Sequence, residues 1–481
     1  MQIKKQENFS EWYNSIIKDA ELCDLRYNLK GFVVFMPWSV MTMKKMYKFY
    51  EAELEKNSHV PALFPALIPE SYLKSESNHV AGFVPEVMWV TEAGSEKLTE
   101  KYAMRPTSET AMYPMYALWI NGKSDLPLKI YQSCQVWRHE TKATKPFIRS
   151  REFHWIEAHD VFATYDEALA QVHQDMQMAE NMIHKKYGIP FIFFRRPQWD
   201  KFAGAVDTYA ADTLMPDGKT LQLPSTHMLG QNFSKAFNIK FTDDDGQSKY
   251  AWQTTYGPAI SRIYAALIAT HGDDKGLILP FDLAPTQIVI VPIWKGENKE
   301  LVTKECEKIR FELADKFSVK LDSTDNTPGF KFNHWESKGV PIRLELGERD
   351  INEGVCILVR RDNREKTKVK FSDLEKKIIE ISEKFDCSIK EKADSFFANL
   401  LSSAKDIKEL NKILEEKGGF VCVPFCTDQM EGKACAEKVK EQTHGNMRGS
   451  MFGNEEKPSA KEICIACGKN ANVYLYVARQ Y

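Results

Sequence analysis

Residues 135–153 read QVWRHETKATKPFIRSREF, and this stretch carries the strongest evidence about the fold. Aromatic and β-branched residues flank a polar loop, a pattern typical of two antiparallel strands joined as a hairpin. Arg138, Glu140 and Arg149 project near the turn, and Phe153 lies on the returning strand. Guanidinium groups match phosphate geometry, and Phe153 can stack on a base, so a triphosphate site is one interpretation. A salt-bridged surface hairpin with a core phenylalanine explains the residue types equally well.

The segments around this hairpin predict an α+β fold, in which helices flank an antiparallel sheet. Residues 9–22 and 42–56 are patterned as amphipathic helices, and residues 59–67 read as a buried strand. Strand patterns rich in aromatic residues continue to about residue 283, with one long helix expected over residues 166–187.

Two further regions follow this α+β core. Two prolines in LPFDLAP, residues 279–285, interrupt the pattern, and a lysine- and glutamate-rich helical stretch begins near residue 388. Between them, an α/β domain is indicated by a strand, a helix and two more strands at residues 287–293, 298–317, 340–346 and 355–359. We therefore expect a core domain at 1–283, an α/β domain at 284–387 and a small α+β C-terminal domain at 388–481.

The composition is that of a globular chain long enough for more than one hydrophobic core. Of 481 residues, 43% are hydrophobic and 27% are charged. The sequence contains no run of eighteen apolar residues, so it predicts no membrane span. The N-terminus MQIKKQEN lacks the features of a signal or transit peptide, so we expect a cytoplasmic protein. A net charge of −2 neither supports nor excludes nucleic-acid binding.

Five of the ten cysteines crowd between Cys422 and Cys467, which is a poor disulfide framework and a better metal site. Two pairs suit a closed, tetrahedral, structural Zn²⁺ site, and they consist of Cys426, Cys435, Cys464 and Cys467. Free thiols are the alternative interpretation, and Cys422 could replace Cys426 as a ligand.

Several short sequence motifs resemble those of a known protein family. The Arg-x-Glu, loop and Phe of residues 138–153 resemble motif 2 of class II aminoacyl-tRNA synthetases. RPTSET, WIEAH, KFAGA and THMLGQNFSK, at residues 105–110, 155–159, 201–205 and 226–235, resemble the prolyl-tRNA synthetases. The resemblance runs from about residue 10 to Tyr481 and favours the archaeal/eukaryotic type, because only about sixty residues separate His159 from Gln222, too few for the bacterial editing domain.

The resemblance implies how ATP is bound. Arg138 and Arg262 would be the catalytic residues, with Arg138 on the α-phosphate and the substrate carboxylate and Arg262 stacked on adenine near the γ-phosphate. The complete ATP-binding set that it implies is Arg138, Glu140, Arg149, Ser150, Phe153, Gln222, Ser225, Ser261 and Arg262. Mg²⁺ is expected to bridge the phosphates.

Proline requires an apolar slot for its ring and acceptors for its cationic amine. The proline-binding set that the resemblance implies is Thr107, Glu109, Arg138, Trp155, Glu157, His159, Phe202 and His227, with Phe83 and Glu86 near the mouth. Taken singly, each of these aromatic residues is more often part of a hydrophobic core. Only its position within a motif typical of the family favours a role in binding.

The implied activity is that of a proline–tRNA ligase, which uses ATP to form prolyl-adenylate and then charges tRNA(Pro). The second domain resembles an anticodon-binding domain, in which Arg343 and Glu345 would contact unpaired guanines. The helix at 42–56 and the strand after it resemble motif 1, which implies a homodimer. The alternative is a catalytically inactive paralogue that acts as an RNA-binding or regulatory subunit, although such relatives usually lose arginines that are present here.

Overall fold

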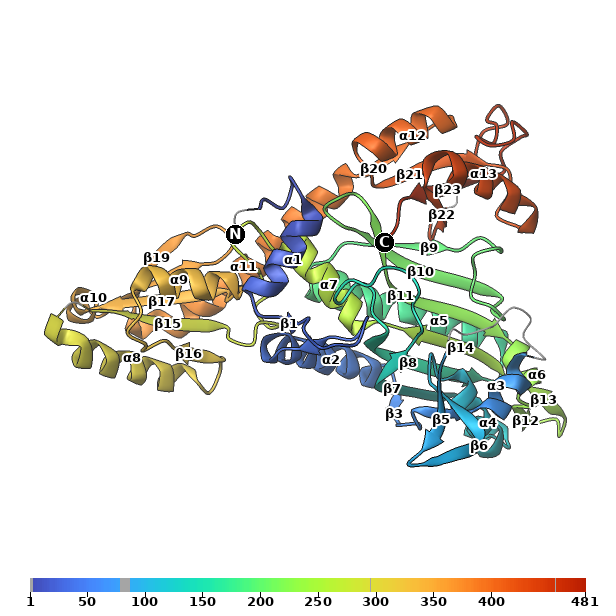
Figure 1. The fold of residues 1–481 in the computed structure, drawn as a ribbon, viewed down its shortest axis with the longest axis horizontal. Helices are drawn as coiled ribbons and strands as arrows, with labels where there is room; N and C mark the ends of the chain where they lie inside the picture. The colour runs from blue at the N-terminus through green and yellow to red at the C-terminus, as the bar shows by residue number, and fades with distance from the viewer. Residues whose placement is uncertain (1–2, 78–86, 295, 455) are drawn as a thin grey trace.

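The computed structural model describes residues 3–77, 87–294, 296–454 and 456–481. A central part carries most of the helices and the largest sheet, an α/β part projects from one side, and a C-terminal part lies beside one edge of that sheet (Figure 1). The α+β fold class expected from the sequence is confirmed. Among the described residues, no helix combines the length and apolar content that a membrane span requires.

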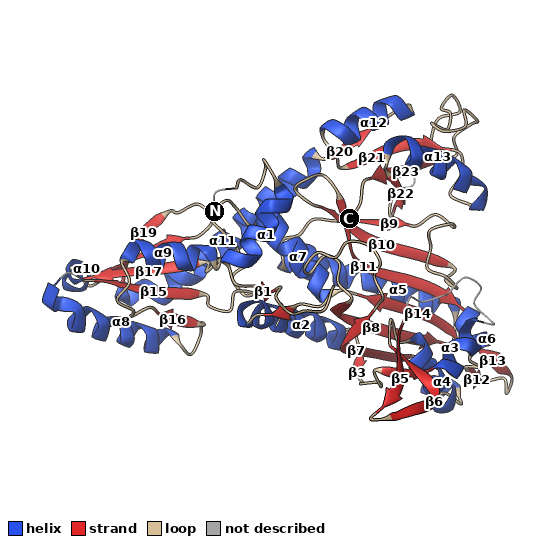
Figure 2. Ribbon diagram, in the orientation of Figure 1, coloured by secondary structure: helices blue, strands red, loops and turns tan. Residues whose placement is uncertain are grey.

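The central sheet is antiparallel along the strands that surround the candidate site (Figure 2). Its strands, in spatial order, are β9 (Ile192–Arg195), β10 (Asp207–Leu214), β11 (Thr220–Gly230), β14 (Trp252–Gly257), β8 (Glu152–Phe162) and β7 (Leu128–Trp137). The predicted hairpin is β7 and β8, in register from Leu128 opposite Val161 to Trp137 opposite Glu152. Residues 138–151 form its connecting loop, so Arg138 and Arg149 lie at one end of the sheet.

Pro224 interrupts the hydrogen-bonding pattern within β11. The register of β10 and β11 shifts between Ala210 and Asp212, so Ala211 lies opposite the Leu223–Pro224 pair. Proline has no backbone N–H to donate to a ladder and is tolerated in a sheet at such irregularities. The bulge allows the strand to continue and brings Gln222 and Ser225 to the same cavity.

Helices cover one face of this sheet and form the main hydrophobic core. They are α1 (Phe9–Asp19), α2 (Pro37–Lys56), α5 (Tyr165–Ala179), the π-helix that continues α5 (Glu180–Lys186) and α7 (Ile260–His271). Thr164 caps α5 and exchanges hydrogen bonds with Glu167, a capping box that marks the start of a helix. The long helix expected over residues 166–187 is therefore confirmed, with a change of helix type near its end.

The prediction of a buried strand over residues 59–67 is wrong in its extent. Only β3 (Val60–Pro61), on the edge of the sheet, and β4 (Leu67–Pro69) are strands, and both residues of β3 are exposed. Pro61 and Pro65 cannot donate to a ladder, which confines such a segment to an edge. β4 instead joins a small sheet with β5 (Met88–Ala93) and β6 (Glu96–Met104).

Shorter elements complete the central part. They are β1 (Cys23–Asp24), β2 (Val34–Phe35), α3 (Glu70–Ser77), α4 (Glu109–Trp119), α6 (Asn232–Ala236), β12 (Lys240–Thr242) and β13 (Ser248–Tyr250). The N-terminal end of α4 lies over the sheet and carries Glu109 into the candidate site.

The second part has a five-stranded mixed sheet, which confirms the α/β pattern expected there. Its strands, in spatial order, are β16 (Val319–Leu321), β15 (Ile288–Ile293), β17 (Ile342–Gly347), β18 (Val355–Arg360) and β19 (Lys366–Lys370), with helices α8 (Lys299–Leu313), α9 (Pro328–Ser337) and α10 (Glu348–Glu353). An ion pair of 2.7 Å joins Arg361 Nη2 to Asp273 of the central part, and Trp38 Nε1 donates to the Lys338 carbonyl over 3.0 Å.

The C-terminal part extends the central sheet. It contains β20 (Leu401–Ser403), α12 (Ile407–Glu416), β21 (Phe420–Phe425), α13 (Lys433–Thr443), β22 (Asn446–Met451) and β23 (Val473–Ala478). β22 pairs with β9 through Ser450 opposite Arg195, so the two sheets form one sheet of eleven strands. The 26-residue helix α11 (Leu374–Asn399) leads into this part, and the boundary expected at 387/388 falls inside it.

Candidate active site

A cavity of about 600 Å³ opens between the strands of the central sheet, the start of α4 and the C-terminal part. Most of the predicted site residues line it, namely Thr107, Glu109, Arg138, Phe153, Trp155, Glu157, Phe202, Gln222, Ser225, His227 and Arg262. A second cavity of about 180 Å³ is lined by Arg149 together with Gln222 and Arg262. The two groups of residues that were expected to bind ATP and proline therefore share one region of the fold.

Three arginines converge where the two cavities meet. Arg138 Nε donates to the Pro106 carbonyl over 3.0 Å, and its guanidinium lies 5.2 Å from the centre of the Phe153 ring. Burial and the positive charges of Arg138 and Arg149 lower the pKa of Arg262 to about 10. Cations that repel one another at the end of a sheet are stabilised by a polyanion, so this cluster is suited to a triphosphate.

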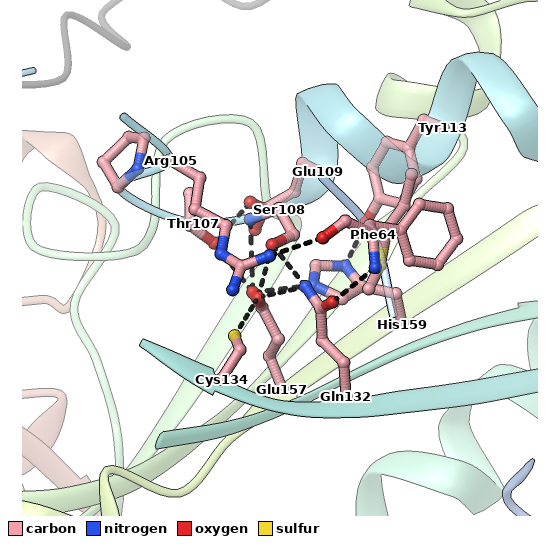
Figure 3. Close-up of polar contacts among 12 residues, drawn as sticks. Phe64, Arg105, Thr107, Ser108, Glu109, Tyr113, Gln132, Cys134, Glu157 and His159 are labelled. Carbon is pink, nitrogen blue, oxygen red and sulfur yellow. Dashed lines mark hydrogen bonds and ion pairs between the residues drawn. The ribbon is translucent and has the colours of Figure 1, made fainter. Parts of the chain in front are cut away.

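Glu157 is the centre of a buried hydrogen-bond network on the other side of the cavity (Figure 3). Its carboxylate accepts from Gln132 Nε2 at 2.8 Å, from the Ser108 backbone N–H at 3.1 Å and from the Ser108 hydroxyl. His159 Nε2 lies 3.3 Å away. Burial alone would raise the pKa of Glu157, but these hydrogen bonds and the charge of His159 outweigh it and hold the pKa at about 2. Glu157 therefore stays anionic.

Glu109 lies beside this network and is almost completely buried. The Thr107 hydroxyl donates to Glu109 Oε2 over 2.5 Å. Neither residue pairs with a lysine or arginine within the described parts of the chain. Carboxylates facing a cavity provide acceptors for a cationic amine.

An apolar wall adjoins the carboxylates. The rings of Phe202 and His227 have centroids 4.7 Å apart. Hydroxyl groups hold both nitrogens of His227, with Thr208 Oγ1 at 2.9 Å from Nδ1 and Ser225 Oγ at 3.0 Å from Nε2. Burial and the nearby charges of His159 and Arg196 lower the pKa of His227 to about 3, so its ring is neutral and serves as an apolar surface.

Several predicted residues do not line the main cavity. His159 lies behind Glu157, where the Tyr113 hydroxyl is 3.0 Å from Nδ1. Ser150 Oγ donates to the Glu152 carbonyl over 2.7 Å, and Ser261 Oγ donates to the His154 carbonyl over 3.3 Å. Glu140 Oε2 is 3.8 Å from Arg149 Nε in the motif 2 loop. Phe83 and Glu86 lie outside the described residues. The roles expected for all of these residues remain predictions.

Arg196 and Arg448 line the cavity although no sequence motif singles them out, and both bind Asp212 behind the wall. Asp212 is completely buried and binds Arg196 through two contacts of 2.8 and 2.9 Å. It also binds Arg448 of the C-terminal part through contacts of 2.8 and 3.1 Å. Arg196 Nη2 reaches Gln222 Oε1 at 3.3 Å. These ion pairs connect the C-terminal part to the wall of the cavity. A further contact between the two parts is made by Arg149 Nη2, which donates to the Tyr481 carbonyl over 2.6 Å.

Four thiols gather beside α13. Four sulfur atoms lie within 4.8 Å of one another, and they belong to Cys426, Cys435, Cys464 and Cys467. The Cys426 and Cys435 sulfurs are 3.7 Å apart. Cys422 is not part of this group, because it lies within β21 opposite Tyr476. Four converging thiols without competing ligands fit a tetrahedral, thiophilic metal such as Zn²⁺.

In the second part, Arg343 and Glu345 pair with each other. Arg343 Nη2 and Nε lie 2.9 and 3.0 Å from Glu345 Oε1, and its Nη1 lies 2.9 Å from Glu336. Its guanidinium stacks on the Phe332 ring at 3.9 Å. The proposed contact with guanine bases remains a prediction, since these groups already bind within the chain.

Comparison with known proteins identifies the class. Residues 89–271 match the tRNA synthetase class II core domain (G, H, P, S and T), and residues 287–381 match an anticodon binding domain. The antiparallel sheet and its arginine cluster are thus the core of a class II aminoacyl-tRNA synthetase. Residues 407–481 match the C-terminal domain of prolyl-tRNA synthetase.

The relatives narrow this class to one family. The proline–tRNA ligase of Thermofilum pendens is 50% identical, and the alignment covers 100% of this chain and 98% of the relative. That of Pyrococcus abyssi is 42% identical over 99% and 98% of the two chains. A structure of Giardia lamblia prolyl-tRNA synthetase in complex with prolyl-adenylate has a TM-score of 0.95, with 35% identity over 100% and 99% of the two chains. The chain belongs to the prolyl-tRNA synthetase family, as expected from its sequence.

Proposed function

We propose that this chain is a proline–tRNA ligase, which activates L-proline with ATP and transfers the prolyl group to the 3′ end of tRNA(Pro). One observation carries the proposal: a single cavity holds an arginine cluster beside carboxylates and an apolar wall. ATP is a polyanion, whereas proline combines an apolar ring with a cationic amine and a carboxylate. The full-length relatives bear this name, which favours the enzyme over an inactive RNA-binding or regulatory paralogue.

Activation requires positioning and charge stabilisation. An oxygen of the proline carboxylate attacks the α-phosphorus of ATP, the bond to the bridging oxygen breaks, and pyrophosphate leaves with the electron pair. Arg138 stabilises the charge on the α-phosphate, while Arg149 and Arg262 bind the outer phosphates. Phe153 stacks on the adenine. No side chain forms a bond to the substrate in this mechanism.

The amino acid binds between the carboxylates and the apolar wall. Thr107 and Glu109 accept hydrogen bonds from the proline amine, and Glu157 lies behind them, with its Oε2 3.4 Å from the Thr107 hydroxyl. Trp155, Phe202 and His227 enclose the ring. In the second step, a terminal ribose hydroxyl of tRNA attacks the carbonyl carbon of the adenylate, and AMP leaves.

Mg²⁺ would accompany ATP and neutralise phosphate charge, since its preferred ligands are oxygen atoms of phosphates and carboxylates. Glu140, whose Oε2 lies 3.8 Å from Arg149 Nε in the motif 2 loop, would offer one such oxygen. We propose a cytoplasmic location, which agrees with ten cysteines that are all free thiols in the described parts of the chain.

A homodimer is proposed on the basis of the surface near α2. A groove of about 470 Å³ runs along this helix beside β7 and is lined by apolar residues that include Phe35, Val40 and Met43. Val34 and Met41, close to it, are each 44% exposed. Exposed apolar surface of this kind is typical of protein interfaces. Sedimentation velocity is expected to give about twice the 55.4 kDa chain mass, and a monomer at micromolar concentration would contradict this state.

The four-thiol group is proposed to hold one structural Zn²⁺. Elemental analysis of purified protein is expected to find about one zinc per chain, because four thiolates leave no open position. Cys435→Ser should remove most of this zinc and lower the melting temperature, since metal binding energy contributes directly to folding. Cys387→Ser, at an exposed cysteine of α11 outside the four-thiol group, is the matched control and should retain the metal. Metal-free protein with all cysteines titratable would refute the assignment.

The proposed function is tested by charging. Purified protein, ATP and radiolabelled proline are expected to label tRNA, and periodate-oxidised tRNA, which lacks the terminal diol, should stay unlabelled. Labelling by another amino acid instead of proline would show that the substrate is wrong. Absence of labelling with any amino acid would favour the inactive paralogue.

A further inference from the structure

One face of α13 forms a wall of the catalytic cavity. Lys433, Ala436, Glu437 and Lys440 all line it, at spacings that place them along one side of the helix. They face a cavity whose other walls carry Arg138 and Arg262. The C-terminal part therefore contributes side chains directly to the site.

We propose that Lys433 and Lys440 bind backbone phosphates of the single-stranded 3′ end of tRNA as it enters this cavity. The proposal rests on the proposed function and assigns a partner to a surface of the same site. Lysine binds phosphate as a flexible point charge, without selecting a base, which suits an unpaired strand that must be guided to the adenylate.

The two lysines differ in their close partners, and neither binds a buried carboxylate in the described parts of the chain. Across the described residues, Lys440 forms no ion pair, and Lys433 has only Glu437 at 4.0 Å. Both side chains are exposed. In contrast, the nearby guanidinium groups of Arg196 and Arg448 share the buried carboxylate of Asp212. The positive charge available to a ligand on this wall therefore comes from the two lysines.

The position of the two lysines favours binding of a nucleic-acid strand rather than of ATP. Arg138, Arg149 and Arg262 already supply the cations for a triphosphate, and they come from the motif 2 loop and α7. The two lysines are seven residues apart on a helix, which separates them by about 10 Å along its axis. That distance exceeds the spacing of adjacent phosphates and suits contacts to two positions along one strand.

Neighbouring contacts in the C-terminal part connect α13 to the central sheet through β22. Cys435 belongs to the four-thiol group, and β22, which follows α13, pairs with β9 of the central sheet. Arg448 of β22 is bound by Asp212 through two hydrogen bonds. The strand that follows α13 is thus joined to the central sheet by backbone pairing and by the Arg448–Asp212 contacts, which places the lysines at the cavity wall.

The test compares a double variant, Lys433→Gln with Lys440→Gln, with the full-length wild-type protein. The KM for tRNA(Pro) in charging is expected to rise about tenfold, whereas the KM values for ATP and proline in pyrophosphate exchange should change less than about twofold. The dependence of log KM on log salt concentration should fall in slope by about one for each phosphate that the variant no longer binds. Lys408→Gln with Lys412→Gln, on exposed positions of α12, removes the same charge and should leave the KM for tRNA unchanged.

An unchanged KM for tRNA and salt slope in the double variant would overturn the proposal, as would a KM for ATP that rises in parallel. Equal effects from the α12 pair would mean that general charge, rather than this wall, attracts tRNA. A wild-type protein that charges no tRNA would contradict the proposed function itself. Because exchange measures folded catalytic protein without tRNA, loss of folding is separable from loss of tRNA binding.

Discussion

Replacing Arg138 by alanine is expected to lower proline-dependent ATP–pyrophosphate exchange by roughly 10²–10³-fold, the range found when one donor to a developing charge is removed. The Pro106 carbonyl holds Nε, and the rings of Phe153 and Trp155 lie 5.2 and 5.5 Å from the guanidinium carbon. This support orients the remaining N–H groups toward the cavity before substrate binds, so their contribution is lost completely on truncation.

Two variants make this result specific. Arg138→Lys keeps the charge and loses the bidentate fork, so it should recover only part of the activity. Arg349→Ala, on the exposed helix α10, is the control and should exchange at the wild-type rate. Exchange by Arg138→Ala within tenfold of the wild type would contradict the role assigned to this residue.

Replacing Asp212 by alanine is expected to destabilise the protein by about 3–5 kcal/mol, because it leaves two buried guanidinium groups without a counter-charge. Asp212 is completely buried, and Arg196 and Arg448 are each at most 4% exposed. Removing one partner of a buried ion pair is far more costly than the pair is stabilising. The melting temperature, measured by differential scanning calorimetry, should fall by roughly 10 °C in the transition that includes the central sheet.

The same substitution should also lower activity, because Arg196 contacts Gln222 and Arg448 lines the cavity. Asp244→Ala is the control: its exposed ion pair with Lys123 should contribute little, and the melting temperature should stay near that of the wild type. A variant at Asp212 with wild-type stability would show that the two arginines find other partners or water.

The elements that follow from local patterns were predictable from the sequence. The motif 2 hairpin is predicted by its strand residues and polar loop, and the long helix at 166–187 by its periodicity. The strand predicted at 59–67 is too long because the prediction followed the apolar character of the segment, whereas Pro61 and Pro65, both visible in the sequence, prevent regular pairing. The limit at 387/388 illustrates a similar difficulty, since a change of composition does not interrupt the continuous helix α11.

The candidate site also contains residues that the sequence predicts and residues that it does not. Residues within compact sequence words, such as Thr107, Glu109 and Trp155, line the cavity as expected. The four cysteines that the spacing predicts as metal ligands lie together in the structure, and the metal itself remains a prediction. Arg448 could not be found from the sequence, because it meets Asp212 from 236 positions away and only the pairing of β22 with β9 brings them together.

The central claim is that this cavity activates proline, and ATP–pyrophosphate exchange with each of the twenty amino acids tests it most directly. Exchange stimulated chiefly by proline, dependent on Mg²⁺ and strongly reduced by Arg138→Ala, is the result predicted by the arginine cluster and the carboxylate-lined pocket. Exchange stimulated chiefly by a different amino acid, or by none of the twenty, would contradict it.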